Sequence, residues 1–433
     1  MNLKFQLFTF LILSVFLLSY TNSQEFEDCS GTRNTEPLLN LTWSKQAQTT
    51  RGQKYYQESG TNYVTLVNIT GSPYQMGVAY GQLLEKEIKN NFEDIIEYME
   101  GIFAENFEKN ENVPKFLIKY LAEMKMGVVE YLLELNYMVG KPYIPERYIQ
   151  EMEGIAKGAS ISYDSIKRLN MFPELIKAAC SIVGTWKDST VDNKLFTLRA
   201  LDWEPDAPVS KYPVITVYHS NEEGSYPFAN IGYAGLIGSI TAVGSQGVSI
   251  QEKVELVREG SIPSTYAGKP WTFVIRDLAQ FSTTLEEMAE TLQDTDRTCP
   301  IFMGIASAES DAFEIVSYTW EKVTFFNDQN FTVIYSDNHP QLDYVAYVDK
   351  KVQPSSNACI GNILSEYWGE ITWETLYRDV CGYHQTGDGQ ICVSDVKNNV
   401  IYLSYAYPPE KIRAYDRAPM YIDLKPFYGI SSQ

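Results

Sequence analysis

The sequence is poor in histidine and in positive charge. Its 433 residues include three histidines, His219, His339 and His384, and no two of them have the spacing of a zinc-binding helix motif. Lysine and arginine number 35 against 55 aspartate and glutamate, a net charge of −20. This balance argues against nucleic acid or an anionic membrane surface as the main partner. We therefore expect neither a metal site nor nucleic-acid binding.

Nucleotide-binding glycine motifs are also missing. There is no P-loop and no G-x-G-x-x-G pattern, so a nucleotide cofactor has no support and we expect no cofactor at all. What is present is ordinary for a folded protein: 44% apolar, 13% aromatic and 21% charged residues. The length corresponds to roughly two or three domains, or to one large one with insertions.

The first residues have the pattern of a secretory signal peptide. Lys4 precedes an apolar run over residues 5–18, and small polar residues follow at 19–23. The run is shorter than the roughly 20 residues that span a bilayer, and no later run approaches that length. We predict a signal peptide over residues 1–23, no transmembrane segment, and a secreted or lysosomal protein.

Three N-x-S/T sequons follow this segment, at Asn40, Asn68 and Asn330. In a secreted chain each sequon marks a candidate surface glycan. We predict N-glycosylation at all three.

The texture of the chain changes near residue 179. Residues 24–60 are polar and predict an irregular arm, and apolar residues then recur at three- and four-residue spacing. We expect helices over residues 83–103, 114–138, 145–157 and 163–170.

Short apolar or alternating runs, divided by Gly, Pro, Asn and Asp, follow residue 179. We expect strands over residues 180–186, 194–202, 214–219, 238–251, 301–306, 312–318 and 331–337. Two helices interrupt them, over residues 271–281 and 284–292, the second with a capping box from Thr284 to Glu287. The predicted fold class is α+β, with helices covering a layered sheet.

Cys180 is a candidate nucleophile at the start of a predicted strand. A thiol needs a base, and histidines are scarce. If the chain is cut before Cys180, its own α-amine becomes a base with a pKa of about 7.7 to 8.0. Arg199 could stabilise the thiolate and Asp202 could bind the amine. A buried or disulfide-bonded cysteine and a structural ion pair are the alternatives.

The residues from Cys180 onward carry a family pattern. They read Cys180-Ser181-x-x-Gly184, then Asp192-Asn193-Lys194, then Arg199-x-Leu201-Asp202-Trp203. This resembles the signature of N-terminal nucleophile (Ntn) amide hydrolases. The resemblance is strongest to the penicillin acyltransferase-like peptidases, with acid ceramidase and choloylglycine hydrolase as relatives.

Motifs outside this segment extend the resemblance, in the same order as in the family. They are residues 71–84 (G-S-P-Y-Q-M-G-x-x-x-G-Q-L-L), residues 148–163 (Y-x-x-E-x-x-G-I-A-x-G-A-x-I-S-Y), residues 235–248 (G-L-I-G and G-x-x-G-V) and residues 337–339 (D-N-H). Two positions depart from the family, which has asparagine where this chain has Ala200 and Ser245.

The resemblance implies a four-layer αββα sandwich that cuts itself between Ala179 and Cys180. A fragment of residues 24–179 and a fragment of residues 180–433 would stay associated. Cys180 would be the nucleophile, flanked by Arg199 and Asp202, and Asn338 would supply an oxyanion-stabilising amide. His339 follows Asn338 directly, and we expect it to be structural because alternate strand residues face opposite ways.

Five cysteines remain if Cys180 is the nucleophile, and an odd number cannot all pair. Cys381 and Cys392 bracket a glycine-rich turn and are the predicted disulfide. Cys29 is predicted to pair with Cys299 or Cys359, which would tie the two fragments together.

The resulting hypothesis is an amide hydrolase or acyltransferase acting on a linear C–N amide bond of a small molecule or lipid. A secreted glycoprotein with the same fold, altered at Ala200 and Ser245 and serving in binding or scaffolding, is the alternative. A papain-like protease pairing Cys180 with a histidine is a third possibility, although the local signature of that family is missing.

Overall fold

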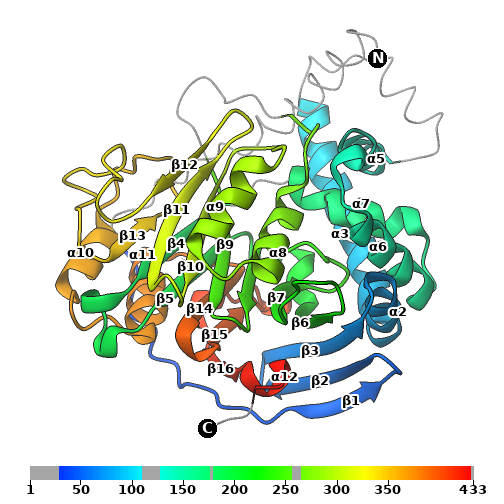
Figure 1. The fold of residues 1–433 in the computed structure, drawn as a ribbon, viewed down its shortest axis with the longest axis horizontal. Coiled ribbons are helices and arrows are strands. Elements are labelled where there is room, and N and C mark those ends of the chain that lie inside the picture. Colours follow the sequence, from blue (N-terminus) through cyan, green and yellow to red (C-terminus); the bar gives the residue numbers. More distant parts are fainter. Residues whose placement is uncertain (1–28, 110–126, 176–178, 256–264, 431–433) are drawn as a thin grey trace.

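Two β-sheets face one another in the centre of the molecule (Figure 1). The computed structural model describes residues 29–109, 127–175, 179–255 and 265–430. In these residues the larger sheet has the strand order β1 (Ser44–Gln48), β2 (Gly52–Ser59), β3 (Asn62–Gly71), β6 (Pro213–Ser220), β7 (Phe228–Tyr233), β8 (Thr241–Gly244), β9 (Val248–Val254), β10 (Ile301–Ser307), β11 (Ala312–Tyr318) and β12 (Val323–Phe326). The smaller sheet has the order β13 (Val345–Val348), β4 (Ala179–Thr185), β5 (Phe196–Asp202), β14 (Gln390–Asp395), β15 (Val400–Tyr405) and β16 (Met420–Asp423).

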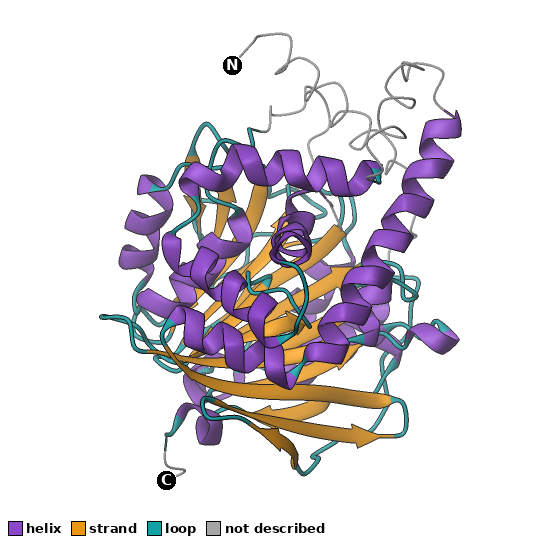
Figure 2. Cartoon of the chain, turned by 90° about the vertical axis from the view of Figure 1, so that its right-hand side faces the viewer, coloured by secondary structure: helices purple, strands orange, loops and turns teal. Residues whose placement is uncertain are grey.

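Helices cover the outer face of the larger sheet (Figure 2). Those that contact it directly are α2 (Pro73–Leu83), α8 (Trp271–Phe281) and α9 (Leu285–Asp294). A second set packs on these and on one another: α3 (Glu85–Lys109), α5 (Val128–Gly140), α6 (Glu146–Gly158) and α7 (Tyr163–Leu175). No helix among the described residues is both long and apolar enough to cross a membrane.

The smaller sheet has its own helical cover. It consists of α10 (Cys359–Glu366), the π-helical turn η5 (Thr375–Val380) and α11 (Cys381–His384). Apolar residues of these helices form one buried cluster with Val183, Leu198 and Ile391 of the sheet. Between the two sheets a second cluster joins Ile182 to Phe302. The layers are therefore α, β, β and α, which confirms the α+β class and the predicted four-layer order.

The family motifs at residues 71–84 and 148–163 form a helix pair. A Cβ atom on Gly77 would lie 2.2 Å from the Glu151 carbonyl oxygen, and one on Gly158 would lie 2.3 Å from that of Val78. Glycine therefore lets the backbones of α2 and α6 touch. Glu151 also binds Arg276 of α8 through both carboxylate oxygens, at 3.0 and 2.6 Å. These motif residues assemble the helical layer and do not belong to the site around Cys180.

Several predicted elements are confirmed. Helix α8 has the predicted bounds, and α9 begins after Thr284 with the predicted capping box, in which Glu287 N donates to Thr284 Oγ1 at 3.2 Å. The strands predicted over residues 180–186, 194–202 and 312–318 correspond to β4, β5 and β11. Part of the helix predicted over 114–138 lies outside the described residues, and so does the signal peptide.

Three element predictions are wrong. The strand predicted over residues 238–251 is a hairpin of β8 and β9, joined by a turn at residues 245–247. The arm at residues 24–60 contains β1 and β2, and all five residues of β1 are exposed, so this edge strand has no apolar alternation to reveal it. Residues 331–337 are turns and not a strand. Phe331 and Ile334 are buried three residues apart and joined by a hydrogen bond from Ile334 N to Phe331 O, whereas Val333 is 63% exposed. This spacing is that of a turn.

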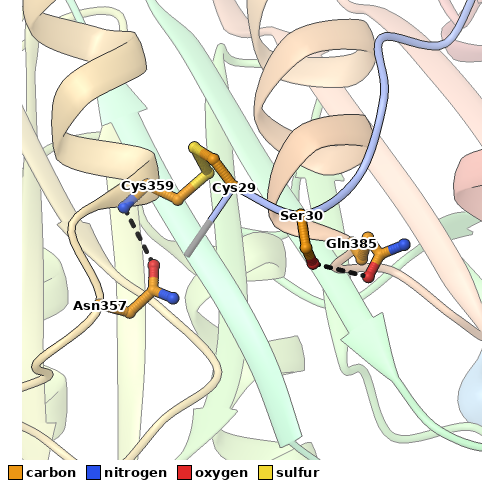
Figure 3. Close-up of a disulfide and its surroundings, with 5 residues drawn as sticks. All are labelled: Cys29, Ser30, Asn357, Cys359 and Gln385. Carbon is orange, nitrogen blue, oxygen red and sulfur yellow. Dashed lines mark hydrogen bonds between the residues drawn. A yellow bond between two sulfur atoms is a disulfide. The ribbon is translucent and has the colours of Figure 1, made fainter. Parts of the chain in front are cut away.

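The disulfide prediction is half correct. Cys29 bonds to Cys359 at the start of α10 (Figure 3), one of its two predicted partners. The predicted Cys381–Cys392 bond is wrong, since both residues are free. Cys381 belongs to the cluster under the outer helices and Cys392 to the main core on the opposite face of β14. Alternation along the strand therefore separates the two sulfur atoms by the thickness of the sheet.

Candidate active site around Cys180

Cys180 lies on the face of the smaller sheet that looks toward the larger one. Strands β4 and β5 are antiparallel, with Cys180 opposite Leu201 and Ile182 opposite Arg199. Because side chains alternate along a strand, Cys180 and Arg199 share one face. Thr197 shares it too, and its hydroxyl lies 3.0 Å from that of Ser249 on β9. The predicted nucleophile and the predicted arginine therefore meet between the sheets.

Arg199 is the centre of the site. Its Nη2 donates to Cys180 Sγ at 3.4 Å and lies 3.4 Å from Glu252 Oε2. Its Nη1 donates to Gln390 Oε1 at 3.0 Å, and its Nε to the Glu252 carbonyl oxygen at 3.4 Å. Arg199 is 1% exposed. Contacts from β9 and β14 thus hold the guanidinium against the thiol.

Burial dominates the ionisation of the Cys180 thiol. It raises the pKa of Cys180 to about 12, and the charge of Arg199 opposes this shift. The thiol of the uncut chain is therefore protonated near neutral pH. A cut before Cys180 would place a new amine on the same residue, and that amine would supply the base that the buried thiol lacks.

Glu252 is the buried carboxyl of the site. Burial raises its pKa to about 7, against the opposing charges of Arg199 and Lys253. Its Oε1 is buried without a hydrogen-bond partner. The neighbouring Lys253 is fully buried, its Nζ donates to Val254 O at 2.9 Å, and burial lowers its pKa. The site therefore holds two charged groups that burial pushes toward neutrality.

We expect Glu252→Gln to flatten the pH dependence of stability between pH 4.5 and 7. The folded chain keeps a proton on Glu252 up to about pH 7, whereas the unfolded chain releases it near 4.5. The contribution of Glu252 to the free energy of unfolding, on the order of 3 kcal/mol, is therefore fully present below pH 4.5. This contribution is lost as the pH rises through 7. Urea unfolding of both proteins at pH 4.5, 5.5 and 7 measures the difference.

The test depends on the difference in the free energy of unfolding between wild type and Glu252→Gln at each pH. Burial and Asp202 also raise the pKa of Asp388 to about 7, and that contribution is common to both. Parallel curves for wild type and variant would contradict a raised pKa at Glu252.

Asp202 lies on the other face of the smaller sheet. It is opposite Ala179 in the ladder, one residue before Cys180. Its Oδ2 accepts from Thr386 Oγ1 at 2.6 Å and its Oδ1 from Gly387 N at 2.9 Å, with Lys350 Nζ at 3.6 Å. The structure thus places Asp202 beside the predicted cleavage bond and not beside the thiol.

Asn338 is not joined to the other three predicted residues. It lies in a turn closed by backbone hydrogen bonds between Ser336 and His339, and no hydrogen bond in the described residues links its side chain to Cys180. Its oxyanion role stays a prediction. The neighbouring His339 is 2% exposed, stacks on Tyr347 at 3.7 Å and hydrogen-bonds to the Tyr347 carbonyl through Nε2. These contacts agree with the expected structural role.

No histidine hydrogen-bonds to Cys180 in the described part of the chain, which includes all three. His219 Nε2 contacts the Phe427 carbonyl at 2.9 Å. His384 is buried with Nε2 unpartnered, and burial lowers its pKa to about 4. The structure therefore gives no support to a papain-like pair.

The two departures from the family pattern lie away from the thiol. Ala200 packs in the cluster under the outer helices, on the face opposite Cys180. Ser245 follows β8, where its N–H donates to Pro227 O and its carbonyl accepts from Asn399. An asparagine at position 200 would point away from Cys180, so its absence leaves the contact of thiol and arginine intact.

The three sequons differ in their surroundings. Asn40 is exposed. Asn330 is exposed, and its side chain holds a turn with Asn327 at 2.7 Å. Asn68 lies within β3, paired on both sides, and its Nδ2 donates to Phe427 O at 3.1 Å. Asn40 therefore offers the most open position for a glycan.

The sequence reasoning missed four residues of the site: Glu252, Gln390, Thr386 and Lys350. One of them had a signal. Gln251, Glu252 and Lys253 are three consecutive polar residues in a strand that is buried throughout. Charged side chains are rarely fully buried in a strand unless an opposite charge or hydrogen bonds compensate for the loss of water. Among the described residues no group of three His, Cys, Asp or Glu could hold a metal ion.

Comparison with known proteins identifies relatives over almost the whole chain. No protein-family model matches it. Protein dcd1A of Dictyostelium discoideum is 35% identical over 441 residues, covering 97% of this chain and 98% of the relative. Protein dcd1B of the same organism is 33% identical over 378 residues, covering 86% and 74%.

Solved structures show weaker likeness. The Caenorhabditis elegans ortholog of N-acylethanolamine-hydrolyzing acid amidase has a TM-score of 0.38 at 12% identity and covers 55% of this chain and 98% of that one. Conjugated bile acid hydrolase from Clostridium perfringens has a TM-score of 0.33 at 11% identity and covers 58% and 95%. By sequence, this chain belongs to the family of the Dictyostelium discoideum proteins dcd1A and dcd1B.

Proposed function

We propose that this chain is an amide hydrolase or acyltransferase of the Ntn type that cuts itself between Ala179 and Cys180. The observation that carries the proposal is the buried contact between Cys180 Sγ and Arg199 Nη2 at 3.4 Å. Cys180 directly follows Ala179, which is opposite Asp202 in the ladder. A cysteine near the start of a strand inside the sheet, an arginine that hydrogen-bonds to its thiol and a carboxylate on the residue paired with Ala179 are groups that such chemistry needs.

Self-cleavage uses only groups of the chain and water. The Cys180 thiol adds to the Ala179 carbonyl carbon, so that a C–S bond forms and the peptide C–N bond breaks. The thiol proton passes to the leaving nitrogen, which becomes the α-amine of Cys180. Water then hydrolyses the thioester, giving a carboxylate on Ala179 and restoring the thiol.

The same thiol then acts on substrate. The α-amine takes the thiol proton, and the thiolate attacks the carbonyl of a linear amide. The substrate amine leaves with that proton, and a thioester on Cys180 remains. Water releases the acid in a hydrolase, whereas a second amine takes the acyl group in an acyltransferase. Arg199 stabilises the thiolate through a charge-assisted hydrogen bond.

We propose a small-molecule or lipid amide as substrate and a secreted or lysosomal location. The signal-peptide pattern at residues 1–23 supports the location, and so does the Cys29–Cys359 bond, because disulfides persist in oxidising compartments.

The fold supports lasting association of the two fragments. Strand β3 of the first pairs along its length with β6 of the second, and the Cys29–Cys359 bond joins the same two pieces. Arg33 adds an ion pair to Asp379 at 2.9 Å. A cut at residue 179 leaves all of these links in place.

We expect the Cys359→Ser variant to release its fragments in SDS without reducing agent, whereas wild type keeps them together until reduced. In gel filtration without denaturant both proteins elute as one complex, because the sheet pairing persists. The control is Cys381→Ala, which removes a cysteine that forms no disulfide. Co-migration of the Cys359→Ser fragments in non-reducing SDS would show a different covalent link.

Intact mass and N-terminal sequencing under reducing conditions test self-cleavage between Ala179 and Cys180. Two pieces, residues 24–179 and 180–433, are expected, and a single chain starting at residue 24 contradicts self-cleavage. A panel of N-acyl amides, ceramides, bile-acid conjugates and peptides then tests turnover. A cut protein that leaves the whole panel untouched favours the binding or scaffolding alternative.

A further inference from the structure

The loop between α11 and β14 closes around the carboxylate of Asp202. Gln385 has a φ of 54° and Gly387 a φ of 93°, both in the left-handed region. A Cβ on Gly387 would lie 2.4 Å from Ile391 Cγ1, so only glycine fits that position. This backbone turns the N–H of Gly387 toward Asp202 Oδ1 at 2.9 Å. The sequence Gln385-Thr386-Gly387 is therefore built to hold a carboxylate.

Two further contacts fix the same carboxylate, and a third holds one of the two donors in place. Thr386 Oγ1 donates to Asp202 Oδ2 at 2.6 Å, and Lys350 Nζ lies 3.6 Å from Asp202 Oδ1. Lys350 also donates to the carbonyl oxygen of Gln385, which ties it to the loop. Both carboxylate oxygens of Asp202 thus have donors from elements far from it in sequence.

The hydroxyl of Thr386 extends these contacts to the residue after Cys180. Thr386 Oγ1 lies 2.8 Å from Ser181 Oγ. A hydroxyl has one hydrogen, and that of Thr386 is donated to the carboxylate, so Ser181 must donate to Thr386. Ser181 and Thr386 are both 0% exposed. A buried chain of hydrogen bonds therefore runs from Ser181 through Thr386 to Asp202.

These hydrogen bonds span the peptide bond between Ala179 and Cys180, which is the bond cut in the proposed self-cleavage. In the ladder Asp202 is opposite Ala179, and Ser181 is opposite Ala200. The two ends of the chain thus flank the peptide bond between Ala179 and Cys180, on the face of the sheet opposite the thiol. Holding both strands there fixes the Ala179 carbonyl for attack from the thiol face and keeps the Asp202 carboxylate on the residue opposite Ala179.

We infer that Thr386 is a positioning residue for self-cleavage, acting through Ser181 and Asp202. The inference rests on the proposed function and adds to it a residue far from Cys180 in sequence. Thr386 touches neither the thiol nor the bond that is cut, and its effect is on the rate at which the fragments appear.

The test follows the fragment that begins at Cys180 over time, by reducing intact mass, after synthesis of the full chain. Thr386→Val has nearly the same volume but no hydroxyl, and we expect it to slow cleavage by roughly ten- to a hundredfold. Thr386→Ser restores the hydroxyl, and we expect a rate close to that of wild type. The matched control is Thr185→Val on β4, because Thr185 Oγ1 is buried without a partner.

The outcomes separate this inference from the proposed function. A wild type that is never cut contradicts the proposed function. A wild type that is cut, with Thr386→Val cut at the same rate, overturns the role of Thr386 alone. Equal slowing in Thr185→Val, or no rescue by Thr386→Ser, shows general destabilisation and also overturns it. If Thr386→Val does not fold, Ser181→Ala removes only the first bond of the chain, and cleavage at the wild-type rate in that variant overturns the inference.

Discussion

The Cys180→Ala variant is expected to remain one chain of residues 24–433, where wild type gives two pieces. Alanine removes the sulfur that attacks the Ala179 carbonyl and leaves the β4 backbone and its pairing to β5 unchanged. Loss of cleavage is expected to be complete, because the alanine side chain has no atom that can form the acyl bond to the Ala179 carbonyl carbon. Reducing intact mass and N-terminal sequencing measure the outcome, together with turnover of any amide that wild type cleaves.

Cys392→Ala is the matched control for this experiment. Cys392 is also fully buried and lies opposite Arg199 in the ladder between β14 and β5. It therefore shares the environment of Cys180 without sharing its position beside the cleavage bond. We expect normal cleavage in Cys392→Ala. Two pieces in Cys180→Ala would show that another protease makes the cut, and the Ntn assignment would then lose its central support.

The Arg199→Met variant is expected to lose both activity and stability. Methionine fills part of the space but cannot donate to Cys180 Sγ, Gln390 Oε1 or Glu252 Oε2. Above about pH 7, where Glu252 is ionised, it leaves this buried carboxylate without its cation, which typically costs about 3–5 kcal/mol. The loss is smaller in acid, because Glu252 then takes a proton. Urea unfolding and the rate of fragment formation measure the two effects separately.

A double variant separates two roles of Arg199, its pairing with the charge of Glu252 and its action on the Cys180 thiol. Arg199→Met with Glu252→Gln removes both members of the buried pair, which is often neutral for stability. We expect this double variant to regain most of the lost stability and none of the activity. Stability is best compared in the Cys180→Ala background, where every protein remains uncut. Recovered cleavage in the double variant would mean that Arg199 serves only as the charge partner of Glu252.

The hairpin that carries the site could be predicted from the sequence, and its surroundings could not. Cys180 and Arg199 meet because β4 and β5 are neighbours in sequence and in the sheet, so alternation along two adjacent strands was enough. Glu252 and Gln390 reach Arg199 from strands 53 and 191 residues away. Their arrival depends on which strand of the larger sheet faces β5 and on β14 pairing with β5. Neither the facing of the two sheets nor the pairing of β14 with β5 can be predicted from the local periodicity of the sequence.

The disulfide error has the same origin. Closeness in sequence suggested Cys381 and Cys392, but a strand face decides which way a cysteine points. The true partner of Cys29 is fixed by the long path of the N-terminal segment over the outer helices, where Gly31 N donates to Tyr383 O and Asn34 N to Arg378 O. Only the assembled layers bring Cys29 to Cys359.

The parallel pairing of β3 with β6 makes the two sheets a single cooperative unit. Between these strands the chain leaves the larger sheet, forms helices α2, α3, α5, α6 and α7, contributes β4 and β5 to the smaller sheet and then returns. The first two strands of the smaller sheet therefore lie inside the connection between two neighbouring strands of the larger one, and contacts between residues distant in sequence slow folding. The uncut chain should therefore unfold in one transition. In the described residues, the segments before and after residue 179 share the larger sheet, because β3 pairs with β6.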